Sequence, residues 1–121
     1  MRIPSLEVVV AFNHSIRGVD EWFDQPDEFH RVERLLDQLA VETDPVADAA
    51  LSVSSLAQGQ AFPEGNKRTA VLVGRWILDR NGLDGAPYIP ENDMELAQSL
   101  LRAARGTDVS KEVIDLCVSR R

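Results

Sequence analysis

The sequence predicts an all-α fold, a compact bundle of about six helices around a buried central helix. Apolar residues recur at helical spacing through most of the 121 residues, and helix-capping or helix-ending residues separate these stretches. No alternating apolar and polar run of useful length indicates a strand. With 44% hydrophobic and 27% charged residues, the composition is that of a globular protein, and we expect one domain over residues 1–121.

The first predicted helix spans residues 5–16. It follows Pro4, which a first turn tolerates, and Gly18 is expected to end it. The next stretch lacks a clean period, so we read it as a loop whose Trp22 and Phe23 pack back on the core.

Two more helices are predicted before the middle of the chain. Asp27 begins one that runs to Leu39, with apolar residues at helical spacing. Asp44 is the expected cap of the other, with Pro45 at its first helical position and Leu56 near its end. The alanines of this helix imply close contact with its neighbours.

The central helix is expected from about residue 66 through residue 80. Its middle, VLVGRWIL, is apolar nearly all round, which predicts a buried helix. Asn81 and Gly82 are expected to end it, because this pair favours the left-handed conformation of a helix C-terminus.

Residues 83–92 read as a second loop with room for a short extended piece. Glu91 or Asn92 is expected to open the next helix, which stops at Gly106. Ser110 is the expected cap of the last helix.

Charge and cysteine content limit the function. The net charge of -7 and pI near 4.7 argue against binding to nucleic acid, which needs clustered Lys and Arg. Cys117 has no internal disulfide partner, which fits a reducing compartment, and is expected to act as a small apolar residue. No apolar run approaches the roughly 20 residues of a membrane span, so we expect a cytoplasmic protein with no membrane partner.

The stretch GQAFPEGNKRT (residues 59–69) stands directly before the predicted central helix. It gathers Glu64, Asn66, Lys67 and Arg68 around Gly65 at a helix start, where unpaired N–H groups and the helix dipole favour an anion. A carboxylate beside phosphates needs a cation between them, and Mg²⁺ binds through one or two carboxylates plus phosphate oxygens. These residues are suited to a nucleotide-phosphate site with a metal.

The same stretch also has a plain structural explanation. Pro-Glu-Gly-Asn is an ordinary turn, and Lys-Arg at a helix start can be solvated charge and nothing more. The P-loop pattern G-x-x-x-x-G-K-[ST] is absent.

QAFPEGNKRTA resembles the signature of the Fic/Doc family, H-x-F-x-[DE]-[GA]-N-[GK]-R, at every position except the first. Lys67 with the following Thr69-Ala70 is similar to the Doc-type (death-on-curing) toxins, and WILDRNGL is similar to the end of the family's central helix. The resemblance implies a toxin of a toxin-antitoxin pair with a Fic/Doc-like all-helical domain. Such a protein transfers a phosphate, or AMP, from ATP or another nucleoside triphosphate to a hydroxyl of a target protein, for example a translation elongation factor.

The resemblance also implies roles for individual residues. Phe62 would anchor the loop in the core and Glu64 would hold Mg²⁺, while Gly65 and Asn66 would form the anion-binding turn.

The two cations that follow have implied roles as well. Lys67 would contact phosphate, and Arg68 would stabilise the charge that develops on transfer. Val71 replaces the second arginine of the longer Fic pattern, which weighs against AMP transfer more than against phosphate transfer.

Gln60 stands where the family has its histidine, the general base. An amide cannot accept the proton of the attacking hydroxyl, and losing a positioned base costs about 10²- to 10⁴-fold in rate. His14 and His30 are no obvious substitutes. Gln60 is therefore an engineered replacement, the mark of a natural silent relative, or a sign that another group supplies the base.

Two further possibilities for the function stay open. The chain can be a catalytically silent Fic-fold binding module that engages an antitoxin-like partner, or a helical interaction domain unrelated to the family. In Doc-type pairs control comes from outside, because the disordered tail of a Phd-like antitoxin folds as a helix into a groove on the toxin.

Overall fold

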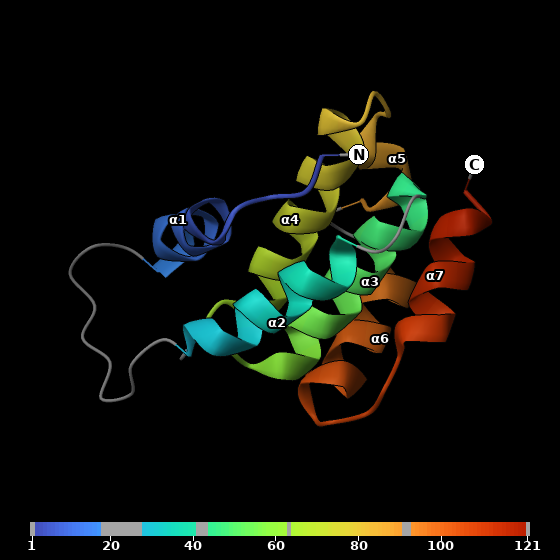
Figure 1. Cartoon of the computed structure of the whole chain (residues 1–121). Coiled ribbons are helices and arrows are strands. Elements are labelled where there is room, and N and C mark those ends of the chain that lie inside the picture. Colours follow the sequence, from blue (N-terminus) through green and yellow to red (C-terminus); the bar gives the residue numbers. More distant parts are fainter. Residues whose placement is uncertain (1, 18–27, 41–43, 63, 91–92, 121) are drawn as a thin grey trace.

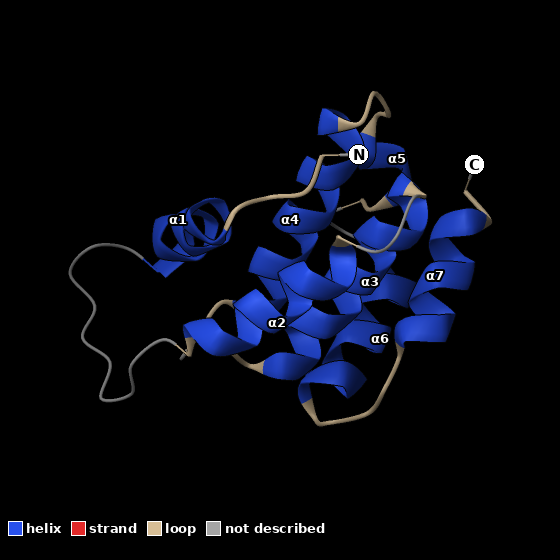
Figure 2. Ribbon diagram, viewed as in Figure 1, coloured by secondary structure: helices blue, strands red, loops and turns tan. Residues whose placement is uncertain are grey.

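The computed structural model describes residues 2–17, 28–40, 44–62, 64–90 and 93–120. These residues form an all-α bundle of seven helices, and none of them lies in a strand (Figure 2). The predicted fold class is confirmed. The helices are α1 (Leu6–Arg17), α2 (Phe29–Leu39), α3 (Pro45–Gly59), α4 (Asn66–Arg80), α5 (Gly85–Tyr88), α6 (Met94–Ala104) and α7 (Ser110–Val118).

The helix ends that depend on local chemistry agree with the sequence prediction. The Asp44 carboxylate accepts a hydrogen bond from the backbone N–H of Val46 (3.1 Å) and caps α3, with Pro45 at the first helical position. At the end of α4, Gly82 has a φ of 85°, and the N–H of Leu83 donates to the Leu78 carbonyl (2.9 Å). This is the pattern by which a left-handed glycine closes a helix.

Two predictions about the C-terminal half were wrong. The second loop contains the short helix α5 in place of an extended piece, because the Asp84 carboxylate accepts from the N–H of Ala86 (3.3 Å) and starts a helical turn. Ser110 is the first residue of α7 and not its cap. Asp108 lies just before that helix and accepts from both the N–H (3.0 Å) and the hydroxyl (2.7 Å) of Ser110.

Other predicted boundaries shift or fall outside the described residues. Helix α3 continues to Gly59, beyond the expected Leu56, and α6 begins at Met94 after its cap Asp93. The expectations for Gly18, Trp22, Phe23, Asp27, Glu91 and Asn92 concern residues that the structure does not describe.

Helix α3 lies at the centre of the bundle, where α2, α4, α6 and α7 pack around it (Figure 1). Its small residues allow this, since Ala49 and Ala50 are fully buried. On α4, Gly74 has no room for a side chain, because a Cβ there would lie 2.5 Å from Cγ2 of Val53. The close approach of α3 and α4 therefore depends on this glycine.

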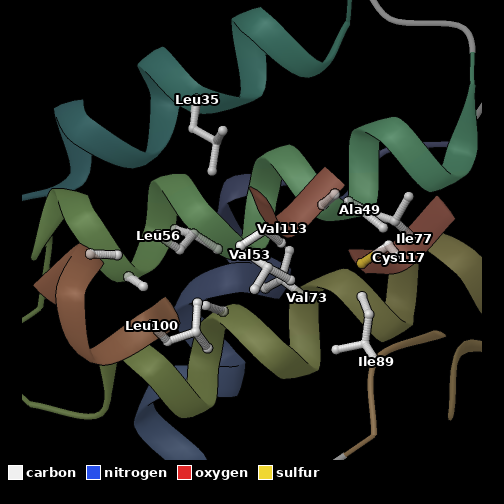
Figure 3. Close-up of a cluster of buried hydrophobic side chains, with 14 of the residues drawn as sticks. Leu35, Ala49, Val53, Leu56, Val73, Ile77, Ile89, Leu100, Val113 and Cys117 are labelled. Atoms are coloured by element: carbon white, nitrogen blue, oxygen red, sulfur yellow. The ribbon is translucent and has the colours of Figure 1, made fainter. Parts of the chain in front are cut away.

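The core fills the space between these helices, as Figure 3 shows for side chains such as Val53, Leu56, Val73 and Leu100. Cys117 belongs to it and is buried, as predicted. Helix α4 contributes Val73, Ile77 and Leu78 to the core, whereas its Val71, Leu72 and Trp76 are only partly buried. The central helix is therefore α3 and not, as predicted, the helix over residues 66–80, because one side of α4 is only partly buried and remains available for a site.

Candidate functional site

The loop that joins α3 to α4 lies between two residues in the left-handed conformation. Gln60 follows the last residue of α3 with φ 50° and ψ 43°, a conformation uncommon for residues other than glycine. Gly65 precedes the first residue of α4 with φ 77°. The chain therefore turns sharply at both ends of this loop.

Asn66 closes the loop from inside. Its Oδ1 accepts from the backbone N–H of Phe62 (3.1 Å), and its Nδ2 donates to the Phe62 carbonyl (2.8 Å) and to Oε1 of Gln60 (3.4 Å). Phe62 is buried in the core. Because these bonds use the side-chain amide of Asn66, the group of Asn66 that can donate to an anion is its backbone N–H.

A residue that the sequence argument missed, Asn13 of α1, holds the other side of the loop. Its Nδ2 donates to the Glu64 carbonyl (2.8 Å) and to Oγ1 of Thr69 (3.1 Å). Asn13 is completely buried, and its Oδ1 has no hydrogen-bond partner within the described part of the chain. The only signal in the sequence is a polar residue on the otherwise apolar stripe of the first helix.

Gly65 is required by this arrangement for two reasons. Its φ disfavours any residue with a side chain. A Cβ would also lie 3.2 Å from Nδ2 of Asn13 and 3.3 Å from Cγ2 of Ile16, so α1 presses closely on the turn.

The start of α4 carries the positive charge of the site. Among the residues that the structure describes, no side chain caps this end, and the first backbone N–H with a bond inside the turn is that of Thr69, which donates to the Gly65 carbonyl (2.9 Å). The N–H groups of residues 66–68 precede it, at the end of the helix where the dipole is positive. Lys67 and Arg68 are exposed in the same turn, so backbone and side chains together favour an anion.

A groove of about 540 Å³ runs from this turn between α4 and α6. Lys67 and Arg68 line it, and Asp93, whose carboxylate pairs with Arg120, lies on the α6 side. Most of the wall is apolar and consists of Val71, Leu72, Leu96, Ala97, Leu100 and Leu101. An apolar groove of this size with a few polar groups at one end is typical of a small-molecule site.

Glu64 is the carboxylate closest in sequence to the cationic turn. Its side chain is exposed, and the bond from Asn13 fixes its backbone. Within the described ranges, no group of three or more His, Cys, Asp or Glu could hold a metal alone. A single carboxylate suits Mg²⁺ only when phosphate oxygens complete the coordination.

Gln60 is exposed and lies beside Asn66 at the entrance to this turn. Its Nε2 donates to the Ala57 carbonyl at the end of α3 (2.6 Å). His14 lies on α1, while His30 of α2 lines a separate cavity together with Gly59 and Ala61. The structure thus brings one histidine closer to the loop than the sequence suggested.

A model of the Fic/DOC family matches residues 6–78, which is more than half of the chain. The chain belongs to the Fic/DOC family. No curated protein matches it. The matched part of this Fic/DOC protein runs from α1 into α4 and includes the loop described above.

Membership indicates chemistry that transfers part of a nucleotide, and Fic/DOC proteins typically use a nucleoside triphosphate with a metal. Among its described residues, this Fic/DOC protein has no helix long and apolar enough to cross a bilayer.

Proposed function

We propose that the chain is a Doc-type member of the Fic/DOC family, which transfers a phosphate, or AMP, from a nucleoside triphosphate to a hydroxyl of a target protein. The observation that carries this proposal is the start of α4. An uncapped helix end, Lys67 and Arg68 together open onto a groove large enough for a nucleoside.

The phosphates bind at the backbone N–H groups of residues 66–68, and the base and ribose lie along the apolar wall of the groove. Lys67 contacts phosphate, and Arg68 stabilises the charge that develops on the transferred group. Glu64 would hold Mg²⁺ together with phosphate oxygens, and this ion would neutralise phosphate charge. Asn66 and Asn13 keep the loop in shape, since both amides bond to its backbone.

Two positions favour phosphate transfer over AMP transfer. Lys67 is the residue that resembles the Doc branch. Val71, where the longer Fic pattern has arginine, is a partly buried residue of the apolar wall. A cation at that position would be needed only if a phosphate lay further along α4.

Gln60 makes this form of the protein a slow enzyme. Its amide is bonded to the Ala57 carbonyl and to Asn66, and an amide does not accept a proton near neutral pH. Histidine at this position would be at the loop end next to Asn66, where it could receive the proton of the attacking hydroxyl.

The proposed Doc-type assignment also implies two protein partners. A Phd-like antitoxin helix would control the protein, and a translation elongation factor is the kind of target that the resemblance implies. Both partners, and the cytoplasm as their location, belong to this proposal.

Nucleotide binding is tested by thermal unfolding with and without Mg-ATP. A ligand at ten times its dissociation constant adds about 1.4 kcal/mol to the unfolding free energy, enough for a melting temperature higher by several degrees. Lys67→Ala should abolish the rise. Lys111→Ala removes an exposed lysine from the first turn of α7 and should preserve it. No rise at millimolar nucleotide would refute the proposal.

Transfer is tested by Gln60→His. With labelled ATP and a cell extract, this variant should modify a protein about 10²- to 10⁴-fold faster than the parent. The second candidate, a silent binding module, is favoured by the bonds that occupy the Gln60 amide. It predicts that Gln60→His labels nothing and leaves growth unaffected, while the protein still captures an antitoxin-like helix.

A further inference from the structure

A second cavity, of about 360 Å³, lies between α2 and the C-terminal half of α3. It is separate from the α4–α6 groove, because the two have no lining residue in common. Its floor includes Leu35 and Leu56, and His30, Arg31 and Arg34 of α2 line its side. We call it the α2–α3 cavity.

The charge of the α2–α3 cavity opposes that of the whole chain. The net charge of the protein is -7, yet two arginines, one histidine and, among the described residues, no Asp or Glu line this cavity. Arg31 is partly neutralised, since its Nε lies 2.6 Å from the Glu28 carboxylate. Arg34 is exposed and has no ion pair with any residue that the structure describes.

The α2–α3 cavity borders the loop of the proposed active site. Gly59 and Ala61, the two neighbours of Gln60, form part of its wall. The backbone N–H of Glu28 donates to the Ala61 carbonyl (2.7 Å), and the Arg31 guanidinium donates to the Gly59 carbonyl. These bonds fix the start of α2 to both sides of position 60.

The α4–α6 groove and the α2–α3 cavity therefore lie at opposite ends of the loop that joins α3 to α4. The α4–α6 groove begins at Lys67 and Arg68, where the nucleotide of the proposed function binds, and the α2–α3 cavity lies at the Gln60 end. A transfer reaction needs the hydroxyl of its acceptor next to position 60, so the α2–α3 cavity is in reach of residues that flank this hydroxyl.

We propose that the α2–α3 cavity binds a carboxylate-bearing segment of the acceptor protein. Arg34 and His30 recognise the carboxylates, and Leu35 and Leu56 receive the aliphatic part of the segment. This inference rests on the proposed function, because it assigns the acceptor side of the same reaction. Charge complementarity decides the ligand, because the arginines of this cavity attract carboxylates although the chain as a whole is acidic.

The test uses the full chain and fluorescein-labelled short peptides in which glutamates, alanines or lysines surround one threonine. Fluorescence anisotropy should show that the glutamate peptide binds about tenfold or more tightly than the other two, with an affinity that falls as salt rises. Arg34→Glu should weaken this binding at least about tenfold, and Arg34→Gln should weaken it less. Arg105→Glu, the same charge change at an exposed site after α6, should leave it unchanged.

A second arm separates the α2–α3 cavity from the nucleotide groove. Saturating Mg-ATP should not displace the glutamate peptide, and NMR shifts on peptide binding should concentrate at Arg34, Gly59 and Ala61. Displacement by Mg-ATP, equal affinity of the Arg34→Glu variant, or equally tight Arg34-dependent binding of a short RNA would each overturn the inference.

The nucleotide-induced rise in melting temperature is measured on the same samples. A rise that persists in the parent and in Arg34→Glu, without binding of the glutamate peptide, would refute the acceptor cavity alone. A missing rise in the parent would refute the nucleotide site of the proposed function.

Discussion

The side chain of Asn66 holds both backbone groups of Phe62. Its Oδ1 accepts from the Phe62 N–H at 3.1 Å and its Nδ2 donates to the Phe62 carbonyl at 2.8 Å, in a buried position. A second amide makes the same kind of clamp near the surface, where the half-buried Asn81 bonds to the N–H and carbonyl of the exposed Arg2 at 2.8 Å each. The Asn66 clamp is buried and the Asn81 clamp is exposed, and each amide has one further bond, from Asn66 to Oε1 of Gln60 (3.4 Å) and from Asn81 to the Ile77 carbonyl (2.7 Å).

Asn66→Ala should therefore be far more costly than Asn81→Ala. Removing Asn66 leaves the N–H and carbonyl of Phe62 buried without partners, at about 1–3 kcal/mol for each group. The exposed groups of Arg2 can bond to water, so Asn81→Ala should cost about 1 kcal/mol or less. Urea unfolding of both variants measures the difference, and equal losses would show that the buried clamp contributes nothing special.

Gly65→Ala should destabilise the protein more than Gly82→Ala. Both glycines have positive φ, 77° and 85°, so both changes incur the left-handed strain of about 1–2 kcal/mol. Only at Gly65 would the new Cβ meet neighbours, with Asn13 at 3.2 Å and Ile16 at 3.3 Å, whereas nothing lies within 4 Å at Gly82.

We expect Gly65→Ala to lose about 1 kcal/mol or more of unfolding free energy beyond the loss in Gly82→Ala. This difference measures how tightly α1 packs against the loop. The losses in the two variants follow from the denaturant concentrations at their unfolding midpoints, provided that the dependence of the unfolding free energy on denaturant concentration is the same in both. An equal loss of unfolding free energy in the two variants would mean that α1 shifts to accommodate the new Cβ at no cost.

Asn13 and Thr69 should be energetically coupled. Nδ2 of Asn13 donates to Oγ1 of Thr69 at 3.1 Å inside the protein, so Asn13→Ala and Thr69→Val each remove the same bond. A double-mutant cycle should give a coupling of about 0.5–1.5 kcal/mol. Asn13→Ala combined with Ser119→Ala, at the exposed end of α7, should be additive, and a coupling as large as that with Thr69 would contradict the assignment.

These contacts show which parts of the molecule the sequence could predict. Helix caps are short-range features, so Asp44 with Pro45 and the Asn81-Gly82 pair identified their helix ends correctly. The predicted cap of α7 was wrong because Asp108 and Ser110 are both good capping residues and lie only two positions apart. Only the structure shows that the Asp108 carboxylate accepts from Ser110.

The candidate site was only partly predictable for a different reason. The polar residues around Gly65 are contiguous, so a short sequence sufficed to propose them. Asn13 contacts Glu64 and Thr69 across more than fifty positions, and no local pattern encodes such a contact. The α4–α6 groove likewise depends on how two helices pack and not on either helix alone.

The ion pair of Asp93 with Arg120 should make stability depend on pH in the acid range. Burial alone would raise the pKa of Asp93, but the hydrogen bond and charge of Arg120 and the N–H groups of Leu96 and Glu95 outweigh it, so the pKa lies below its ordinary value of 3.8. A carboxyl with a lowered pKa in the folded state stabilises that state above its ordinary pKa. This stabilisation is lost as the pH falls below about 3.8 and through the folded-state value.

Arg120→Gln isolates this contribution from the other carboxyls, because Asp108 and Glu112 also have lowered pKa values and keep their own partners in the variant. Urea unfolding of parent and Arg120→Gln from about pH 2 to pH 7 should give curves that are well separated near neutrality and converge at the acid end, where Asp93 is protonated in both. Asp93→Asn should show the same convergence. A separation that stays constant down to the lowest pH would mean that Arg120 acts through its bond to the Tyr88 carbonyl (3.0 Å) and not through the charge of Asp93.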